Sequence, residues 1–278
     1  MTIEPPLVRT ITPQARVGLL TCGRALWKYR ELFWSLTLRD LQVRYKQSVM
    51  GFGWTVLQPL AFTVLFSVVF TRFIRVPPTG IPYPLFALCG LLPWTFFSAF
   101  LAAAGTSVVG NSSLVTKIYF PREIFPLAVL TAGFINFLVA CSTLVGLMAL
   151  YRIVPSVHIL WLPLILLVQL VFSIGIGLLL AAGNVFYRDV QALVPILTQL
   201  WMYASPIIYP VSVVPERWQL WYSLNPLVGI LEGYRRALLL HQPPDLHAFL
   251  FAAAIAVTTF FAGYRVFKSL EDRFADVI

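Results

Sequence analysis

The chain has 278 residues, of which 59% are hydrophobic and only 11% are charged, and its mean hydropathy is +0.83. In a soluble domain roughly a quarter of the residues are charged, so this composition excludes an ordinary soluble protein and indicates an integral membrane protein. The net charge of +9 does not indicate a nucleic-acid partner, because the basic residues lie between long apolar runs, where membrane topology explains them. The three cysteines form no CxxC pair and the three histidines lack metal-ligand spacing, so we expect neither a disulfide framework nor a metal site.

The first 48 residues form no apolar run long enough to cross a membrane. Residues 1–25 contain three prolines and little periodicity, and we interpret them as a cytoplasmic tail. Residues 26–48 combine an aromatic and aliphatic stripe, including Phe33 and Leu36, with basic side chains such as Arg44. This combination is typical of an amphipathic helix lying flat at the membrane interface, although a helix packed against a partner protein is compatible with it.

Six long apolar runs follow, and no Asp or Glu lies within any of them. The first run has 21 residues and would reach about 30 Å as a helix, the thickness of a hydrocarbon core. Fourteen lysines and arginines lie on the side of the two termini and six on the other side, which predicts that both termini are cytoplasmic. We therefore expect an all-α membrane domain over residues 49–278, with spans at about 51–71, 83–109, 126–151, 159–184, 191–209 and 246–264.

A short polar segment, residues 110–126, separates the second and third runs. Asn111 is a good N-cap for one or two helical turns, Pro121 would break that helix, and Pro126 could open the next one. By the positive-inside rule, we expect this segment to face the cytoplasm. It is either an ordinary solvated turn or a short helix along the membrane face that another subunit pushes.

Residues 210–244 are too polar to span a membrane and too apolar for an ordinary loop. Trp218, Trp221 and Tyr222 suit a membrane interface, and Asn225 with Pro226 supplies an N-cap and a first-turn proline. We expect two short helices that enter the membrane partway from the outer side. Irregular backbone at that depth is tolerated only where protein or a wet cavity covers it.

The sequence contains no phosphate-binding glycine loop, no plausible catalytic triad and no metal cluster. A proton-driven carrier usually needs an ionisable group at membrane depth, and these spans lack acidic ones. Energy must then come from outside the chain, unless the chain is a passive pore. Aromatic faces can contact sugar rings, or they can simply pack in the core or face lipid. The aromatic residues that could line a conduit are Trp54, Phe62, Phe66, Phe70, Trp94, Phe96, Phe97, Trp201 and Tyr203.

Several ordered motifs resemble the ATP-binding-cassette type-2 permeases that export polysaccharides such as O-antigen, capsule and teichoic acid. The first motif comprises Arg39, Asp40, Leu41, Arg44, Tyr45, Ser48, Gly51, Trp54 and Pro59. The second comprises Asn111, Leu114, Lys117, Tyr119, Phe120, Pro121, Arg122, Glu123 and Pro126. The remaining matches are Arg188 with Asp189, residues 205–210, and Asn225 with Pro226. Together they cover nearly the whole chain after residue 25.

The resemblance implies a homodimer that binds two copies of a separate ATPase subunit and moves a lipid-linked polysaccharide across the bacterial cytoplasmic membrane. ATP and magnesium would lie on the ATPase, so this chain would be no enzyme and hold no cofactor. The residues that the resemblance implies contact the ATPase are those of the second motif other than Pro126, together with Arg39, Asp40, Arg44, Tyr45, Arg188 and Asp189. The implied outer gate comprises Tyr209, Trp218, Trp221, Tyr222, Asn225, Glu232 and Arg235.

Two alternatives stay open at this point. The first is a drug or small-molecule exporter of the same fold. The second is a membrane transferase or ligase for lipid-linked sugars, which would need clustered charged residues near one membrane face. Candidates for that cluster are Glu216, Glu232, Arg235 and Arg236.

Overall fold

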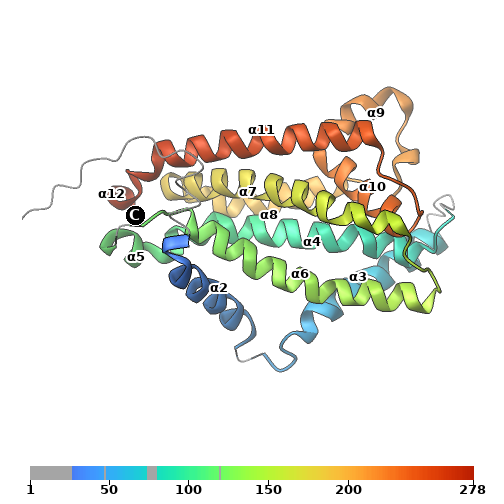
Figure 1. Cartoon of the computed structure of the whole chain (residues 1–278), viewed down its shortest axis with the longest axis horizontal. Coiled ribbons are helices and arrows are strands. Elements are labelled where there is room, and N and C mark those ends of the chain that lie inside the picture. Colours follow the sequence, from blue (N-terminus) through green and yellow to red (C-terminus); the bar gives the residue numbers. More distant parts are fainter. Residues whose placement is uncertain (1–26, 47, 74–79, 119) are drawn as a thin grey trace, which may run out of the picture.

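The computed structural model describes residues 27–46, 48–73, 80–118 and 120–278, so the predicted tail, Leu26 and Tyr119 lie outside the described residues. Every regular element in these ranges is a helix, and the longer ones run roughly parallel along one axis (Figure 1). The α-helices are α2 (Arg30–Tyr45), α3 (Gly53–Val68), α4 (Tyr83–Ser107), α5 (Ser112–Lys117), α6 (Ile124–Leu150), α7 (Leu162–Phe186), α8 (Asp189–Tyr203), α9 (Glu216–Ser223), α10 (Pro226–Leu238), α11 (Leu246–Glu271) and α12 (Phe274–Val277). The remaining pieces are a π-helical turn, Val69–Phe73, that continues α3, and short 3₁₀ turns at Val109–Asn111, Val157–Trp161 and Val211–Val213.

Five helical segments of the described chain are long and apolar enough to cross a membrane, which makes this a multi-pass membrane protein. They are Gly53–Phe73, Tyr83–Ser107, Ile124–Leu150, Val157–Phe186 and Leu246–Glu271. The sequence predicts a sixth span at residues 191–209, but α8 has 15 residues and reaches roughly 22 Å, short of a hydrocarbon core of about 30 Å. Residues 204–210 continue from α8 as turns rather than helix.

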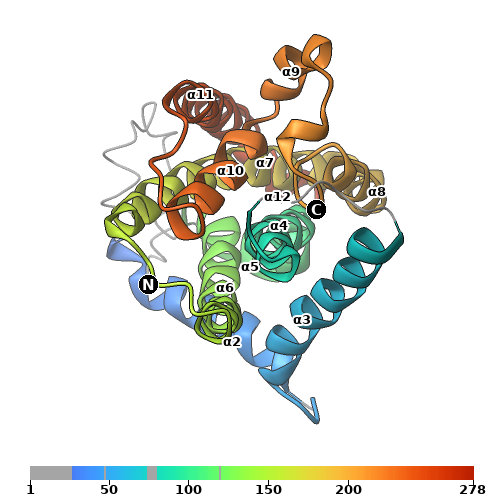
Figure 2. The ribbon, with the colours of Figure 1, turned by 90° about the vertical axis from the view of Figure 1, so that its right-hand side faces the viewer.

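Helix α4 lies at the centre of the bundle, and α3, α6, α7, α8 and α10 pack around it (Figure 2). Its sequence is apolar on every face, as expected of a helix buried on all sides. Leu85, Leu88 and Phe97 of α4 are completely buried. Helix α4 thus forms the core against which the surrounding helices pack.

Helices α7 and α11 approach so closely that glycine is required at their crossing. A Cβ atom added at Gly175 would lie 2.7 Å from the main-chain nitrogen of Phe260, and Gly263 of α11 faces Gly175 directly. The small residues of the fourth apolar run therefore allow backbone-to-backbone contact between two long helices, as is common in membranes.

The bundle has two distinct ends (Figure 1). The α5 end carries α5, α12, the start of α2 and the turn between α7 and α8, and the rings of Phe186 and Phe274 meet there at 6.1 Å. The α10 end carries α9, α10, the start of α4 and the connection that joins α6 to α7.

Candidate functional site

The polar segment at residues 110–126 lies at the α5 end, where part of it is exposed and part is buried. Helix α5 begins directly after Asn111, but the Asn111 side chain does not cap it. Instead, Asn111 Nδ2 donates to the carbonyl of Ser107 at 2.7 Å, and Asn111 Oδ1 accepts from the guanidinium of Arg39 at 2.8 Å. Asn111 thus joins the end of α4 to α2, and the two longest motifs of the sequence lie side by side.

Arg39 lies on the exposed side of α2 and also pairs with the adjacent carboxylate of Asp40, at 3.1 Å. On α5, Ser113, Thr116 and Lys117 are exposed, as is Ile118 beyond it. Exposed polar groups from two helices therefore form one surface at the α5 end. Arg188 and Asp189, in the turn between α7 and α8, are exposed at the same end.

Arg122 and Glu123 face the interior and take part in a buried ionic cluster, which we call the Lys268 clasp. The clasp comprises Arg122, Glu123, Lys268 and Glu271. Lys268 Nζ lies 2.5 Å from Glu123 Oε1 and 2.6 Å from Glu271 Oε2, and the Glu123 side chain is only 3% exposed. The main-chain N–H of Arg122 donates to Glu271 Oε1 at 2.9 Å, and its guanidinium donates to the main-chain carbonyl of Glu271. The clasp ties the start of α6 to the last turn of α11.

Sequence reasoning placed Arg122 and Glu123 in a segment that another subunit grips, but gave them no partner within the chain. The missed partners are Lys268 and Glu271, and the ring of Phe274, 5.9 Å from the Arg122 guanidinium. One pattern in the sequence could have indicated these partners: Lys268 and Glu271 lie three residues apart, beyond the last apolar run. They lie on α11, which continues seven residues past the predicted end of the span. Contact of the segment with an ATPase stays a prediction.

The other residues predicted to couple to a partner are divided between core and surface. Phe120 is buried between Tyr29 and Phe125, with ring centroids 6.3 and 5.3 Å away. Leu114 and Pro121 are half-buried, and Lys117 is exposed. The exposed members, rather than the whole motif, are available to a partner.

A hollow of about 680 Å³, which we call the inner hollow, is lined by Arg44 and Tyr45, two further residues predicted to couple to a partner. It lies between the α2–α3 turn, α3, α4, α6 and α8. Trp54 and Trp94, predicted for a conduit, line it as well. The Tyr45 hydroxyl donates to Asn136 Oδ1 at 2.6 Å and lies 2.8 Å from Thr55 Oγ1, so the end of α2 is joined to α3 and α6 at this wall.

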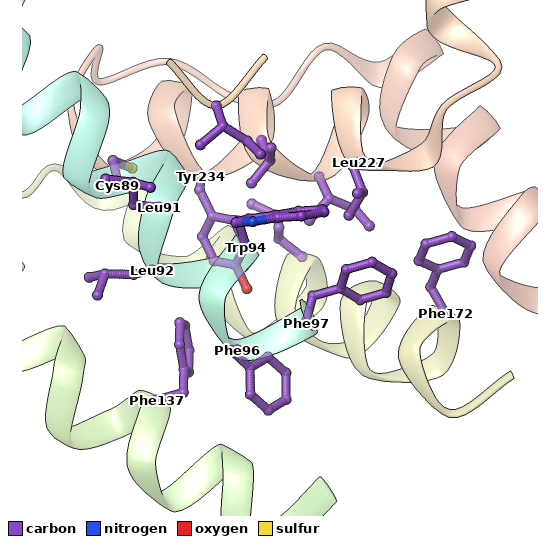
Figure 3. Close-up of a cluster of buried hydrophobic side chains, with 14 of the residues drawn as sticks. Cys89, Leu91, Leu92, Trp94, Phe96, Phe97, Phe137, Phe172, Leu227 and Tyr234 are labelled. Atoms are coloured by element: carbon purple, nitrogen blue, oxygen red, sulfur yellow. The ribbon is translucent and has the colours of Figure 1, made fainter. Parts of the chain in front are cut away.

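Of the remaining aromatic residues predicted for the conduit, Phe96 also lines the inner hollow and the others lie elsewhere. Phe62, Phe66 and Phe70 form a ladder along α3, with centroids 6.1 and 6.2 Å apart, and Phe62 is exposed. Phe97 is 0% exposed and packs between Phe172 and Trp201, so it belongs to the core (Figure 3). Phe96 lies on another side of α4, with its ring 5.3 Å from that of Phe137, and both line the inner hollow. Tyr203 is exposed.

A second hollow of about 350 Å³, the outer hollow, lies between α8 and α9 at the α10 end. Trp218, Trp221, Tyr222 and Asn225, all predicted for the gate, line it together with Trp201 and Ala204. Asn225 Oδ1 accepts from Trp201 Nε1 and from the N–H of Leu227, both at 3.1 Å, so this side chain caps α10 as predicted. The outer hollow is thus built from the sequence segment that was expected to form a gate.

Three tyrosines connect the α8–α9 segment. The Tyr222 hydroxyl donates to Tyr209 at 3.1 Å, and Tyr209 donates to the carbonyl of Tyr203 at 2.8 Å. Burial, aided by the hydrogen bond to Tyr209, raises the pKa of Tyr222 well above its ordinary value. Tyr222 therefore stays protonated, as its role as a donor requires.

Arg235 is only 1% exposed, and its guanidinium is enclosed by main-chain carbonyls and an aromatic ring. It donates to the carbonyls of Pro206 and Ile207, at 2.5 and 2.7 Å, and to that of Phe86 at 3.4 Å. The guanidinium carbon lies 3.6 Å from the centroid of the Phe86 ring. Gly90 leaves room for it, since a Cβ there would lie 2.6 Å from the guanidinium nitrogen. We call this arrangement the Arg235 cage, and it fixes α10 against the turns that follow α8. Glu232, one turn earlier, is half-buried.

Comparison with known proteins extends the motifs to the whole chain. The sequence profile described as ABC-2 type transporter matches residues 31–239. The chain belongs to the ABC-2 type transporter family. The O-antigen export system permease protein RfbA of Myxococcus xanthus is 33% identical over 92% of this chain and 98% of its own length. A permease of the same name from Klebsiella pneumoniae is 29% identical, covering 87% and 93%, and the polysialic acid transport protein KpsM of Escherichia coli is 22% identical, covering 86% and 93%.

Proposed function

We propose that this chain is the membrane permease subunit of an ATP-driven exporter that moves a lipid-linked polysaccharide, similar to O-antigen, out of the bacterial cytoplasm. The observation that carries the proposal is the 33% identity to an O-antigen export permease over nearly the full length of both proteins. The sequence has no phosphate-binding loop of its own, so ATP and magnesium would be bound by two copies of a separate ATPase subunit. Two copies of the permease would enclose the path of the polymer.

The proposed topology places the α5 end in the cytoplasm, together with both termini, because the basic residues are enriched on that side. Helix α8 and residues 204–210 would together make the sixth crossing, with the non-helical part covered by the Arg235 cage, as irregular backbone at membrane depth requires. Helix α2 buries Leu36 and Thr37 and exposes Trp34, Leu38 and Val43, which suits a helix at the membrane surface.

The proposed mechanism begins at the exposed polar surface of α5, α2 and the α7–α8 turn, which the ATPase would grip. Movement of the connection after α5 would reach α6 directly and α11 through the Lys268 clasp. The glycan would pass from the inner hollow toward the α10 end, where the outer hollow and α9 would form the gate. A path without acidic residues and rich in aromatic faces suits a sliding polymer, because strong ionic contacts would hold it in place.

The structure disfavours the alternative of a sugar transferase or ligase. Of its four candidate charged residues, Arg235 is committed to main-chain carbonyls, and Arg236 lies 3.7 Å from Asp245. Arg235 is therefore not free to hold a reacting group. An exporter of small molecules would share the fold, and the transported compound itself distinguishes it.

Deletion of the gene tests the proposal. We expect the surface polymer to disappear while its lipid-linked precursor accumulates in the cytoplasm, and a plasmid copy to restore export. A tagged copy should capture an ATPase, and a variant of that ATPase unable to hydrolyse ATP should reproduce the deletion. Unchanged surface polymer in the deletion strain would contradict the proposed function.

A further inference from the structure

One wall of the inner hollow carries a buried amide whose donor group has no hydrogen-bond partner among the described residues. Asn136 of α6 is 7% exposed, and its Nδ2 makes no hydrogen bond in the described part of the chain. Buried amide N–H groups are almost always paired, so an unpaired one indicates a ligand or a water molecule. Thr63 also has a buried, unpaired side-chain atom, but it lines neither hollow.

The orientation of the Asn136 amide is fixed by hydrogen bonds on its other side. The Tyr45 hydroxyl donates to Asn136 Oδ1 at 2.6 Å, and Thr55 Oγ1 lies 2.8 Å from the same hydroxyl. Because the Tyr45 hydroxyl uses its single proton to donate to Asn136, it accepts a hydrogen bond from the hydroxyl of Thr55. This chain of hydrogen bonds polarises each member and directs the two N–H bonds of Asn136 away from Tyr45. The amide is thus a donor held in place for an acceptor that the described residues do not supply.

The rest of the inner hollow has the chemistry of a carbohydrate site. Trp54 is 54% exposed and offers an accessible ring face, and Phe96 and Phe137 line the hollow from α4 and α6. The side chains of Gln58 and Ser98 add polar groups that can donate and accept. Among the described residues that line the hollow none is an acid, and the only cation is Arg44. The volume of about 680 Å³ lies within the range of small-ligand sites, roughly 300–1,000 Å³.

We propose that the inner hollow is a binding site for a neutral sugar unit of the transported polymer, in which Asn136 donates to a sugar oxygen and Trp54 stacks on the ring. The inference rests on the proposed function and adds a specificity-determining residue to it. Tyr45 acts as a positioning residue, because it holds the amide and does not itself face the sugar with a free proton. The motif residue Tyr45 would then serve the substrate rather than the ATPase.

Protection of an introduced cysteine tests occupancy of the hollow directly. Ala99 is exposed and lines the hollow, so Ala99→Cys should react with a water-soluble maleimide in the purified permease–ATPase complex in nanodiscs. Soluble oligosaccharide released from the surface polymer of the host should slow that reaction at least threefold. Ser212→Cys, exposed at the α10 end, should react at the same rate with and without oligosaccharide.

Variants of Asn136 then test the donor. Asn136→Asp keeps an acceptor for Tyr45 but removes the N–H groups. Asn136→Leu removes both the acceptor and the N–H groups while keeping a side chain of similar size. Each Asn136 variant should raise, about tenfold, the oligosaccharide concentration that halves the rate of the maleimide reaction at Ala99→Cys. Each should also lower polymer export. Thr63→Val, which removes another unpaired group with little change of volume, should alter neither.

Three outcomes overturn the inference: no protection of Ala99→Cys in the parent, unchanged protection in both Asn136 variants, or equal losses in Thr63→Val. Unchanged protection in both variants would mean that the amide holds only water. These failures differ from failure of the proposed function, in which the gene deletion itself leaves the surface polymer unchanged.

Discussion

The two ends of the bundle hold their buried charges in different ways. At the α5 end, Lys268 lies between the carboxylates of Glu123 and Glu271, and Arg122 closes the group. At the α10 end, Arg235 binds main-chain carbonyls and the face of Phe86, and its guanidinium meets no carboxylate within hydrogen-bond distance in the described chain. Both arrangements satisfy the rule that a buried charge needs partners, one with opposite charges and the other with dipoles and a ring.

This difference indicates what each end can do. The Lys268 side chain is 23% exposed, so water can reach the clasp, and flexible side chains can exchange partners while the helices shift. The Arg235 cage depends on main-chain carbonyls at fixed positions in the turns after α8, so it tolerates little displacement. We infer that the α5 end can transmit movement while the α10 end keeps its geometry.

The largest effect is expected from Arg235→Met, which removes the cage. The carbonyls of Pro206 and Ile207 lie outside helices and would lose their donor, at roughly 1–3 kcal/mol each. The free energy of unfolding should fall by roughly 2–6 kcal/mol, seen as a lower Tm and a lower yield of the purified protein. Arg236→Met is the matched control, because Arg236 is partly exposed, and its pair with Asp245 contributes about 1 kcal/mol or less. Equal losses in the two variants would remove the distinction.

Gly90→Ala tests the same cage from the opposite wall. The added Cβ would lie 2.6 Å from the Arg235 guanidinium nitrogen and 2.9 Å from the carbonyl oxygen of Ile207, both held in place by other contacts. Overpacking of this kind costs about 1–3 kcal/mol, so the Tm should fall. Gly105→Ala on the same helix meets no neighbouring atom closer than 3.9 Å and should leave the Tm unchanged or raise it. A tolerated Gly90→Ala would mean that the guanidinium can move aside.

Lys268→Met tests the clasp and is expected to be milder. Glu123 and Glu271 would be left as neighbouring buried carboxylates, and partial access of water should limit the loss to about 2 kcal/mol, below that of a fully buried pair. Combining it with Glu123→Gln should restore part of the Tm, because one unpaired charge is removed. Additive losses in the double variant would show that the charges act independently. If the clasp transmits movement, export per ATP hydrolysed should also fall in Lys268→Met.

The sequence predicted best those features that depend on local pattern. The all-helical membrane architecture follows from apolar runs without charge, and α4 occupies the centre because none of its faces is polar. The cap at Asn225 was predictable because its acceptor and donor are two residues apart. The sixth span was predicted less well, because the 19-residue run at 191–209 overlaps a helix of only 15 residues, which begins at Asp189 and is followed by turns.

The features that the sequence could not predict depend on contacts distant in the chain. Nothing near Arg122 and Glu123 indicates that Lys268 and Glu271, nearly 150 residues later, enclose them. Trp54 and Phe97 are both aromatic residues in charge-free runs, yet one lines a hollow and the other is core, because α4 is surrounded by helices whereas most of α3 is exposed. Aromatic content therefore predicts the availability of ring faces but not their location.

The smallest effect on stability is expected at the exposed surface of the α5 end. Arg39 is 47% exposed, and its pairs with Asp40 and Asn111 should contribute less than about 1 kcal/mol, so Arg39→Ala should leave the Tm nearly unchanged. If α2 and α5 together receive the ATPase, the same change should lower export and the copurification of the ATPase several-fold. Arg30→Ala, exposed on the same helix and in contact with Trp27 rather than α5, provides the control and should preserve both. Equal export by the two variants would indicate that the ATPase does not contact the Arg39–Asn111 pair. A fall in Tm would instead mean that this surface contributes to folding, and the contrast between a movable α5 end and a fixed α10 end would weaken.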